Sequence, residues 1–176
     1  FENDGIDCTH LHVLRTVPTG TSSVWVDATG ENRIVNAPGA NAVYTPKLAQ
    51  DVPVEEASLL LIQNEIPAET LAEVTRRAAK AGVPVIWNPA PFGPGDEAAV
   101  SPSDVRFITP NEVEATAMLG VPAFPGPEAA LDALRARGWP GVIVTLGAGG
   151  VAAMDGTQRH RVAAPAVRAV DTTGAG

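Results

Sequence analysis

The stretch that decides the fold runs from Ser58 to Asn88, SLLLIQNEIPAETLAEVTRRAAKAGVPVIWN. Its first six residues form a continuous, mostly apolar run of strand length, and residues 83–88 form a second one. Between them, residues 68–82 place Leu71 and Val74 at helical spacing and end on a glycine, which is typical of an amphipathic helix with a glycine cap. Two short strands joined by a helix predict a βαβ unit with parallel strands.

The same alternation continues toward the C-terminus. We expect a strand at 104–109, a helix at 111–120, a helix at 127–138, a strand at 141–147 and its hairpin partner at 150–155. Apolar strands that alternate with amphipathic helices favour a mostly parallel sheet with helices on both faces. The predicted fold class is therefore α/β, and residues 41–176 are expected to form the central part of that domain.

The first forty residues have a different pattern. β-prone runs at 10–16, 21–28 and 32–37 are separated by Gly, Pro and Asn, which predicts an antiparallel meander. Two or three strands bury too little apolar surface to be stable alone, so this sheet must pack on another part of the protein. Residues 1–40 are therefore expected to form a small antiparallel unit beside the α/β domain.

Composition excludes several classes of partner. The chain has 176 residues, a net charge of −8 and no run of Lys and Arg, which argues against nucleic acid and against an anionic membrane surface. No apolar run approaches the roughly 18 residues of a membrane span. The single cysteine, Cys8, allows no intrachain disulfide and favours a reducing, cytoplasmic compartment. An acidic protein can still bind an anionic ligand locally, through backbone N–H groups and a metal ion.

Polar residues and glycines follow each predicted strand of the parallel sheet. Ligands of open α/β sheets bind outside the carboxyl ends of the strands, so these residues could face one crevice. They are Gln63 to Glu65, Asn88, Thr109 to Glu114 and Thr145 to Gly150. The tryptophans Trp25, Trp87 and Trp139 are expected in the core or at an interface.

Asn111 and Glu114 have two readings. Their spacing is that of a capping box, in which each side chain accepts a hydrogen bond from the backbone N–H of the other residue. The same amide and carboxylate could also orient water around Mg²⁺, an ion that prefers oxygen ligands and bridges to phosphate. The cap is the simpler reading of these residues taken alone, and both stay open.

The segments TLGAGG (145–150) and VDTTGAG (170–176) could present backbone amides to a phosphate. The first has an equally simple reading as a tight turn between two strands, and it fits neither a Walker A loop nor a Rossmann fingerprint. The second would form an anion hole if a helix begins directly after it. Asn88 precedes a proline that favours extended geometry, and Glu65 is either a solvated carboxylate or an acceptor for a polyol.

Seven segments, taken together and in order, resemble the PfkB-type carbohydrate kinases, and within them the ribokinases. These segments are DGID (4–7), TGTSSVWVDATGEN (19–32), APGAN (37–41), NPAP (88–91), TPNEVEA (109–115), VTLGAGGV (144–151) and VDTTGAG (170–176). The resemblance implies transfer of the ATP γ-phosphate to a sugar hydroxyl, with Mg²⁺ and K⁺ as cofactors. It also implies that residues 19–32 are part of a lid.

The resemblance implies roles for individual residues. Glu65 would lie near the sugar, and Asn111 with Glu114 would serve Mg²⁺ through water. Asp171 and Thr173 would hold K⁺. The anion hole would be Gly174, Ala175 and Gly176. Contacts to ATP would come from Asn88, Thr145, Leu146, Gly147, Ala148, Gly149 and Gly150.

Other expectations concern what the 176 residues lack. In the family, the catalytic aspartate would follow Gly176, and a sugar-binding motif and adenine-covering helices would lie outside this sequence. We therefore expect this piece alone to be inactive. Alternatives are a sibling kinase for fructose, a sugar phosphate or a nucleoside, and a non-catalytic sugar- or nucleotide-binding relative. Because the lid strands have exposed edges, we also expect a homodimer through residues near 10–36.

Overall fold

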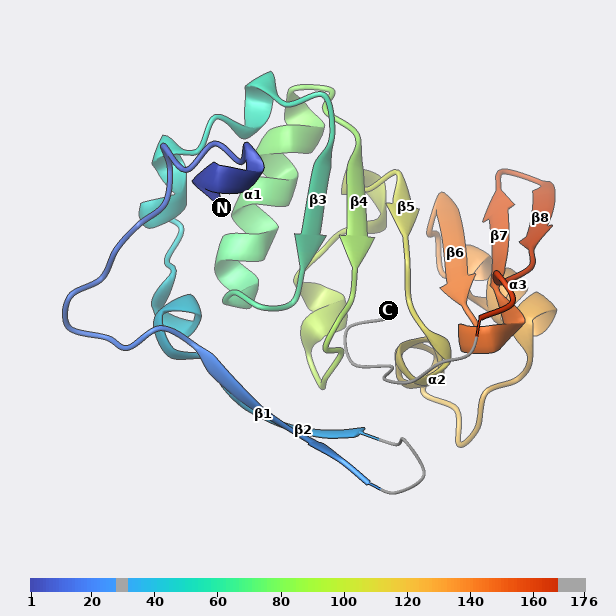
Figure 1. Cartoon of the computed structure of the whole chain (residues 1–176). Helices are drawn as coiled ribbons and strands as arrows, with labels where there is room; N and C mark the ends of the chain where they lie inside the picture. The colour runs from blue at the N-terminus through green and yellow to red at the C-terminus, as the bar shows by residue number, and fades with distance from the viewer. Residues whose placement is uncertain (28–31, 168–176) are drawn as a thin grey trace.

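The computed structural model describes residues 1–27 and 32–167, which form two separate sheets (Figure 1). The smaller sheet pairs two antiparallel strands, β1 (Thr21–Val26) and β2 (Asn32–Ala37). The larger sheet has six strands in the order β3-β4-β5-β6-β7-β8. They are β3 (Leu60–Gln63), β4 (Val85–Asn88), β5 (Phe107–Ile108), β6 (Gly141–Thr145), β7 (Val151–Asp155) and β8 (Gln158–Val162).

Strands β3 to β6 of the larger sheet are parallel, whereas β7 and β8 run antiparallel to their neighbours. Helix α1 (Ala68–Lys80) connects β3 to β4, and α2 (Glu112–Leu119) and α3 (Pro127–Ala136) connect β5 to β6. The predicted α/β class, with a small antiparallel sheet beside it, is confirmed. No helix in the described parts of the chain is long and apolar enough to cross a membrane.

Two strands differ from the prediction. The strand predicted at 10–16 is wrong, because this segment has no strand geometry and no described strand pairs with it. A β-prone run without a neighbour has no partner for its backbone hydrogen bonds. Strand β8 was not predicted, because its sequence QRHRV has no apolar alternation; it pairs with β7, where His160 lies opposite Ala153.

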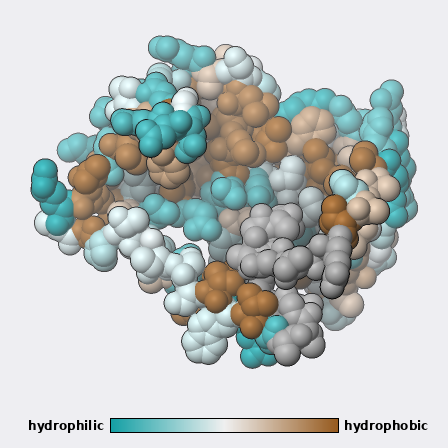
Figure 2. Space-filling view, viewed as in Figure 1, coloured by the Kyte–Doolittle hydropathy of each residue, from teal (hydrophilic) through white to brown (hydrophobic). Residues whose placement is uncertain are grey.

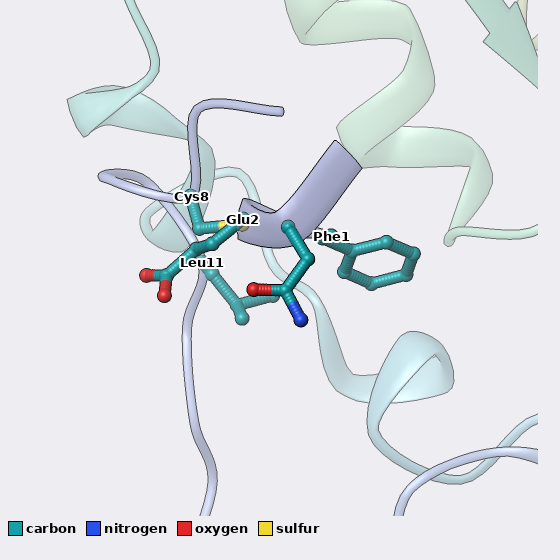
Figure 3. Close-up of a pocket in the computed structure, with 5 residues that line it drawn as sticks. Phe1, Glu2, Cys8 and Leu11 are labelled. Carbon is teal, nitrogen blue, oxygen red and sulfur yellow. The ribbon is translucent and has the colours of Figure 1, made fainter. Parts of the chain in front are cut away.

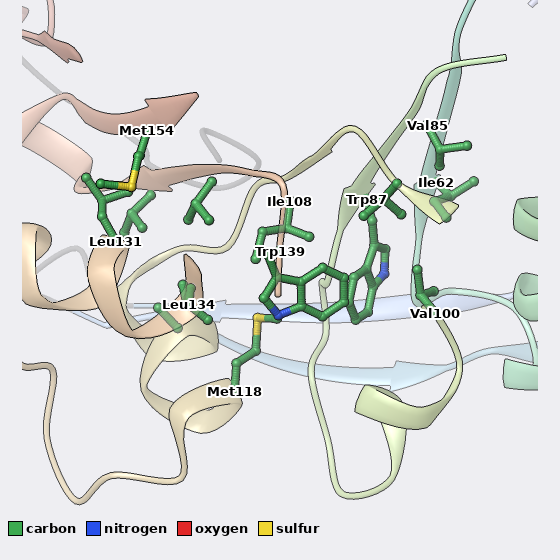
Figure 4. Close-up of a cluster of buried hydrophobic side chains, with 14 of the residues drawn as sticks. Ile62, Val85, Trp87, Val100, Ile108, Met118, Leu131, Leu134, Trp139 and Met154 are labelled. Atoms are coloured by element: carbon green, nitrogen blue, oxygen red, sulfur yellow. The ribbon is translucent and has the colours of Figure 1, made fainter. Parts of the chain in front are cut away.

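Helices cover one face of the larger sheet. The core combines alternate strand residues with apolar residues of all three helices, among them Ile62, Leu71, Trp87, Ile108, Met118 and Leu134. Figure 4 shows the rings of Trp87 and Trp139 side by side within this cluster, with their centroids 5.3 Å apart. Both tryptophans are therefore core residues as predicted, whereas Trp25 on β1 is 70% exposed.

The sequence predicted helices on both faces of the larger sheet, but the described helices leave the opposite face uncovered. Alternate residues on this open face, such as Leu61, Ile86 and Ile143, are partly or largely exposed, and Leu61 is 65% exposed. In Figure 2, apolar atoms gather over the region of β3 and β4. Since parallel sheets are normally covered on both faces, this open face is available for contact with further polypeptide.

Arg77 ties the segment that precedes β3 to helix α1. Its Nε and Nη2 donate hydrogen bonds to the two Glu55 carboxylate oxygens at 2.7 and 2.9 Å. Its Nη1 and Nη2 also donate to the carbonyls of Ala49 and Val52, both at 2.8 Å. Donation of hydrogen bonds to the Glu55 carboxylate raises the pKa of Arg77, which favours the charged guanidinium.

We expect Arg77→Lys to lower the free energy of unfolding by about 2 kcal/mol, because lysine keeps the charge but cannot reproduce the four planar hydrogen bonds. Urea unfolding curves of the two proteins measure the difference. Arg76→Lys is the matched control. Arg76 is 59% exposed and, among the described residues, forms an ion pair only with Glu73 one turn earlier, so we expect a change below about 0.5 kcal/mol. Equal losses of stability in the two variants would contradict the role of Arg77 in holding the segment before β3 against helix α1.

Candidate functional site

The parallel strands bring their predicted polar residues to one edge of the larger sheet. Gln63 lies opposite Asn88 in the pairing of β3 with β4. At the end of β6, Thr145 forms an isolated parallel bridge with Asn111, which follows β5, and the Thr145 N–H donates to the Pro110 carbonyl at 3.0 Å. In Figure 1, the arrowheads of β3 to β6 point to this edge, and the β1–β2 hairpin lies beyond it. The described strand-end candidates therefore share one edge.

The pair Asn111 and Glu114 forms the predicted capping box at the start of α2. Asn111 Oδ1 accepts a hydrogen bond from the Glu114 N–H, and Glu114 Oε2 accepts one from the Asn111 N–H, both at 2.8 Å. Burial raises the pKa of the Glu114 carboxyl, and the hydrogen bond from the Asn111 backbone opposes that shift. The cap uses only one of the two carboxylate oxygens.

A metal ion can be served by Glu114 only through its second carboxylate oxygen, Oε1, because Oε2 is used in the cap. No other described residue donates a hydrogen bond to this carboxylate, so Oε1 can accept one from a metal-bound water. Residues 1–27 and 32–167 contain no group of three or more His, Cys, Asp or Glu side chains that could hold a metal ion. An ion beside Glu114 would thus take most of its ligands from water and phosphate, which is usual for Mg²⁺.

The glycine-rich turn after β6 forms a single 3₁₀ turn, η7 (Gly147–Gly149). The Leu146 N–H donates to the Gly150 carbonyl at 2.8 Å. The N–H groups of Gly149 and Gly150 donate to the carbonyls of Leu146 and Gly147 at 2.8 and 3.0 Å. Within the described residues, the N–H groups of Gly147 and Ala148 have no acceptor. They are therefore the amides of this turn that can serve a ligand.

Gly150 has a packing role that the sequence did not reveal. Its φ of 83° and ψ of −130° lie in a region that only glycine adopts readily. A β-carbon at this position would lie 2.0 Å from the Val162 carbonyl oxygen and 2.7 Å from the Ala164 nitrogen. The segment that leaves β8 thus passes directly against the backbone of the glycine-rich turn.

Asn88 and Glu65 lie at the ends of β4 and β3. Asn88 is half-buried, and its carbonyl accepts a hydrogen bond from the Ala90 N–H at 2.8 Å. Glu65 is exposed and free to meet a solute. Their neighbour Asn64 joins these two strand ends through its side chain, which contacts both β4 and the loop that follows it. The sequence predicted that Asn64 lies at the carboxyl ends of the strands but indicated no role for it.

The remaining predicted site residues cannot be placed. Asp171, Thr173, Gly174, Ala175 and Gly176 lie outside the described residues.

A hollow of about 290 Å³ near the start of the chain is lined by residues among the first eleven, including Phe1, Glu2, Cys8 and Leu11 (Figure 3). It contains none of the strand-end candidates, so it is separate from the proposed site.

Residues 1–176 match the family described as pfkB family carbohydrate kinase. The chain belongs to the PfkB family. It is 33% identical over 180 residues to the ribokinase of Haemophilus influenzae, an alignment that covers 100% of this chain and 58% of that enzyme. It is 31% identical over 183 residues to a deoxyribokinase of Salmonella typhi, again over 100% of this chain and 58% of that enzyme.

A solved PfkB relative supports the fold directly. The structure of Arabidopsis thaliana ribokinase complexed with ribose and ATP superimposes with a TM-score of 0.73 and 28% sequence identity. The superposition covers 91% of this chain and 53% of that protein. The chain therefore spans a little over half the length of the PfkB proteins to which it is compared.

Proposed function

We propose that the full-length protein containing this chain transfers the γ-phosphoryl group of ATP to a hydroxyl of a pentose such as D-ribose. The observation that carries the proposal is the shared sheet edge, where Glu65, Asn88, Asn111 and the turn after β6 follow neighbouring strands. Similarity to a ribokinase, to a deoxyribokinase and to a ribokinase complexed with ribose and ATP supports the choice of sugar and nucleotide.

The position of each residue suggests which part of the substrates it would bind. The exposed Glu65 carboxylate would accept a hydrogen bond from a sugar hydroxyl, and the half-buried Asn88 would bind the nucleotide side. The free amides of Gly147 and Ala148 would donate to phosphate oxygens, because backbone N–H groups stabilise anionic oxygens without carrying a charge.

The cofactors of the proposed reaction are Mg²⁺ and K⁺. When bound, Mg²⁺ neutralises charge on the transferring phosphoryl group. Glu114 would orient a water of that ion through its free oxygen while its other oxygen keeps the cap. We propose that Asp171 and Thr173 hold K⁺ and that Gly174, Ala175 and Gly176 form the anion hole, with the catalytic base directly after them.

The experiment is a kinase assay on the full-length protein. With ATP, Mg²⁺ and D-ribose we expect release of ADP, with a higher rate when K⁺ replaces Na⁺. The 176-residue chain assayed beside it should show no turnover. Absence of turnover on ribose, deoxyribose, fructose, sugar phosphates and nucleosides would reject the kinase assignment. A preference for another of these substrates would instead identify a sibling kinase, and a residue other than aspartate after Gly176 would favour a non-catalytic relative.

We also propose that residues 1–40, with the β1–β2 hairpin, belong to a lid through which the protein forms a homodimer. The hairpin exposes apolar side chains on both of its faces, including Val24, Trp25, Ile34 and Val35. Exposed apolar surface of this kind favours association. The single cysteine and the use of ATP lead us to place the protein in the cytoplasm.

The dimer is tested by light scattering coupled to size-exclusion chromatography. We expect the full-length protein to elute as a dimer and Trp25→Lys to shift it to a monomer, because a buried lysine would lose its hydration. Val167→Lys is the matched control, since Val167 is similarly exposed, at 79%, but lies outside the hairpin. A monomeric wild-type protein, or a dimer that Trp25→Lys leaves intact, would overturn the hairpin interface.

A further inference from the structure

We infer that Asn64 is a positioning residue that couples the loop after β3 to the loop after β4, and so sets Glu65 and Asn88 relative to each other. Asn64 stands between Gln63, the last residue of β3, and Glu65. The inference deepens the proposed function and rests on it for the roles of Glu65 and Asn88, but the coupling itself is a property of the described structure.

Asn64 makes hydrogen bonds with its backbone and with both ends of its side chain. Its N–H donates to the Ala90 carbonyl at 3.1 Å. Its Oδ1 accepts from Trp87 Nε1 at 2.8 Å, and its Nδ2 donates to the Pro91 carbonyl at 2.9 Å. One residue therefore joins the end of β3 to the strand before Asn88 and to the loop after it.

A carboxylate extends this contact into the same loop. Asn64 Nδ2 lies 3.3 Å from Asp96 Oδ2, and that oxygen also accepts a hydrogen bond from the Gly93 N–H at 2.8 Å. The loop from Pro89 to Asp96 is thus held at three positions, Ala90, Pro91 and Asp96, by a single asparagine.

The chemistry of the partners requires an amide at position 64. The Trp87 indole N–H can only donate, whereas the Pro91 carbonyl and the Asp96 carboxylate can only accept. A side chain that meets both must accept on one side and donate on the other, which leucine and aspartate cannot do. Trp87 is fully buried, so its N–H has no access to water if Asn64 is lost.

This network controls the geometry of the proposed site through adjacent residues. Glu65 is exposed and follows Asn64 directly, while Asn88 follows Trp87 and precedes the loop that Asn64 holds. A shift of Asn64 therefore moves the proposed sugar-side carboxylate and the proposed nucleotide-side amide relative to each other. Small misplacements of such groups cost much in binding and rate because productive geometry is narrow.

The test compares Asn64→Leu, Trp87→Phe and the double variant in the full-length protein. We expect Asn64→Leu to raise KM for both ATP and the sugar by about tenfold and to lower Tm. Trp87→Phe leaves the bonds to Ala90, Pro91 and Asp96, so both KM values should stay within about twofold of wild type. In the double variant no indole N–H is left unpaired, so its loss of Tm should be smaller than the sum of the two single losses, while both KM values stay high.

Two kinetic outcomes would overturn the coupling. One is an Asn64→Leu protein with both KM values unchanged. The other is a double variant in which both KM values return to those of wild type, since this would reduce Asn64 to a partner for the indole.

Hydrogen exchange distinguishes failure of the coupling from failure of the proposed function. If wild-type protein phosphorylates no sugar, the proposed function fails, yet peptides spanning 88–96 should still exchange faster in Asn64→Leu than in wild type and in Trp87→Phe. Equal exchange in all three proteins would overturn the coupling whatever the activity.

Discussion

Gly150→Ala is expected to destabilise the protein strongly. A β-carbon at Gly150 would stand 2.0 Å from the Val162 carbonyl oxygen, and this atom belongs to backbone that is fixed by the pairing of β8 with β7. Neither partner is a flexible side chain, so the clash can be relieved only by moving the end of β8 or the turn after β6.

Conformational strain adds to the clash. The φ and ψ of Gly150, 83° and −130°, are accessible to glycine but costly for alanine. Together we expect a loss of about 4 kcal/mol in the free energy of unfolding, a large part of the total stability of an ordinary domain. Urea unfolding followed by the fluorescence of the buried Trp87 and Trp139 measures it.

Gly147→Ala is the matched control within the same turn. Gly147 has φ of 52°, but a β-carbon added there would meet nothing within 4 Å, so alanine should cost only about 1–2 kcal/mol. Similar losses for the two variants would show that backbone conformation alone, and not the approach of the chain after β8, makes glycine necessary at position 150.

Glu114→Gln is expected to lower kcat/KM for ATP in the full-length protein by about a hundredfold while leaving the fold intact. Glutamine can still accept the hydrogen bond from the Asn111 N–H, so the capping box persists. The negative charge proposed to orient metal-bound water is removed. Glu114→Ala removes both features, and we expect it to lose about 1 kcal/mol of stability in addition to activity.

The pH dependence of stability has a definite sign. Burial raises the pKa of Glu114 in the folded state above its unfolded value, so the folded state is favoured by protonation. This contribution is present at low pH and is lost as pH rises through the folded pKa. Glu114→Gln should therefore be at least as stable as wild type at neutral pH, with the difference shrinking as pH falls through that window. An unchanged kcat/KM for ATP in Glu114→Gln would leave Glu114 with its capping role alone.

The parallel part of the fold was predictable from local patterns. Residues 58–88 contain two short apolar runs, which predict strands, and a helical spacing between them, which predicts a helix. The structure has β3, α1 and β4 in this stretch. Residues 10–16 were misassigned and β8 was missed for one physical reason. Whether a short segment becomes a strand depends on the neighbour that pairs with it, and a single local sequence does not contain that neighbour.

The position of the site was predictable from the sequence, but the contacts of its individual residues were not. Strand order put Asn88 and Asn111 near one edge, and the spacing of Asn111 and Glu114 identified the cap. The sequence could not show that the amide of Gly149 is used inside its own turn or that Gly150 meets a later segment. Both facts depend on contacts between backbone atoms, which residue types do not specify.

The open face of the larger sheet has a practical consequence for protein engineering. Its helical side is already packed, while Leu61 and Ile86 lack a complementary apolar layer among the described residues. A separately expressed polypeptide that carries such a layer could add to this side without disturbing the other. Strands β3 and β4 would then be covered on both sides, as the strands of a parallel sheet usually are.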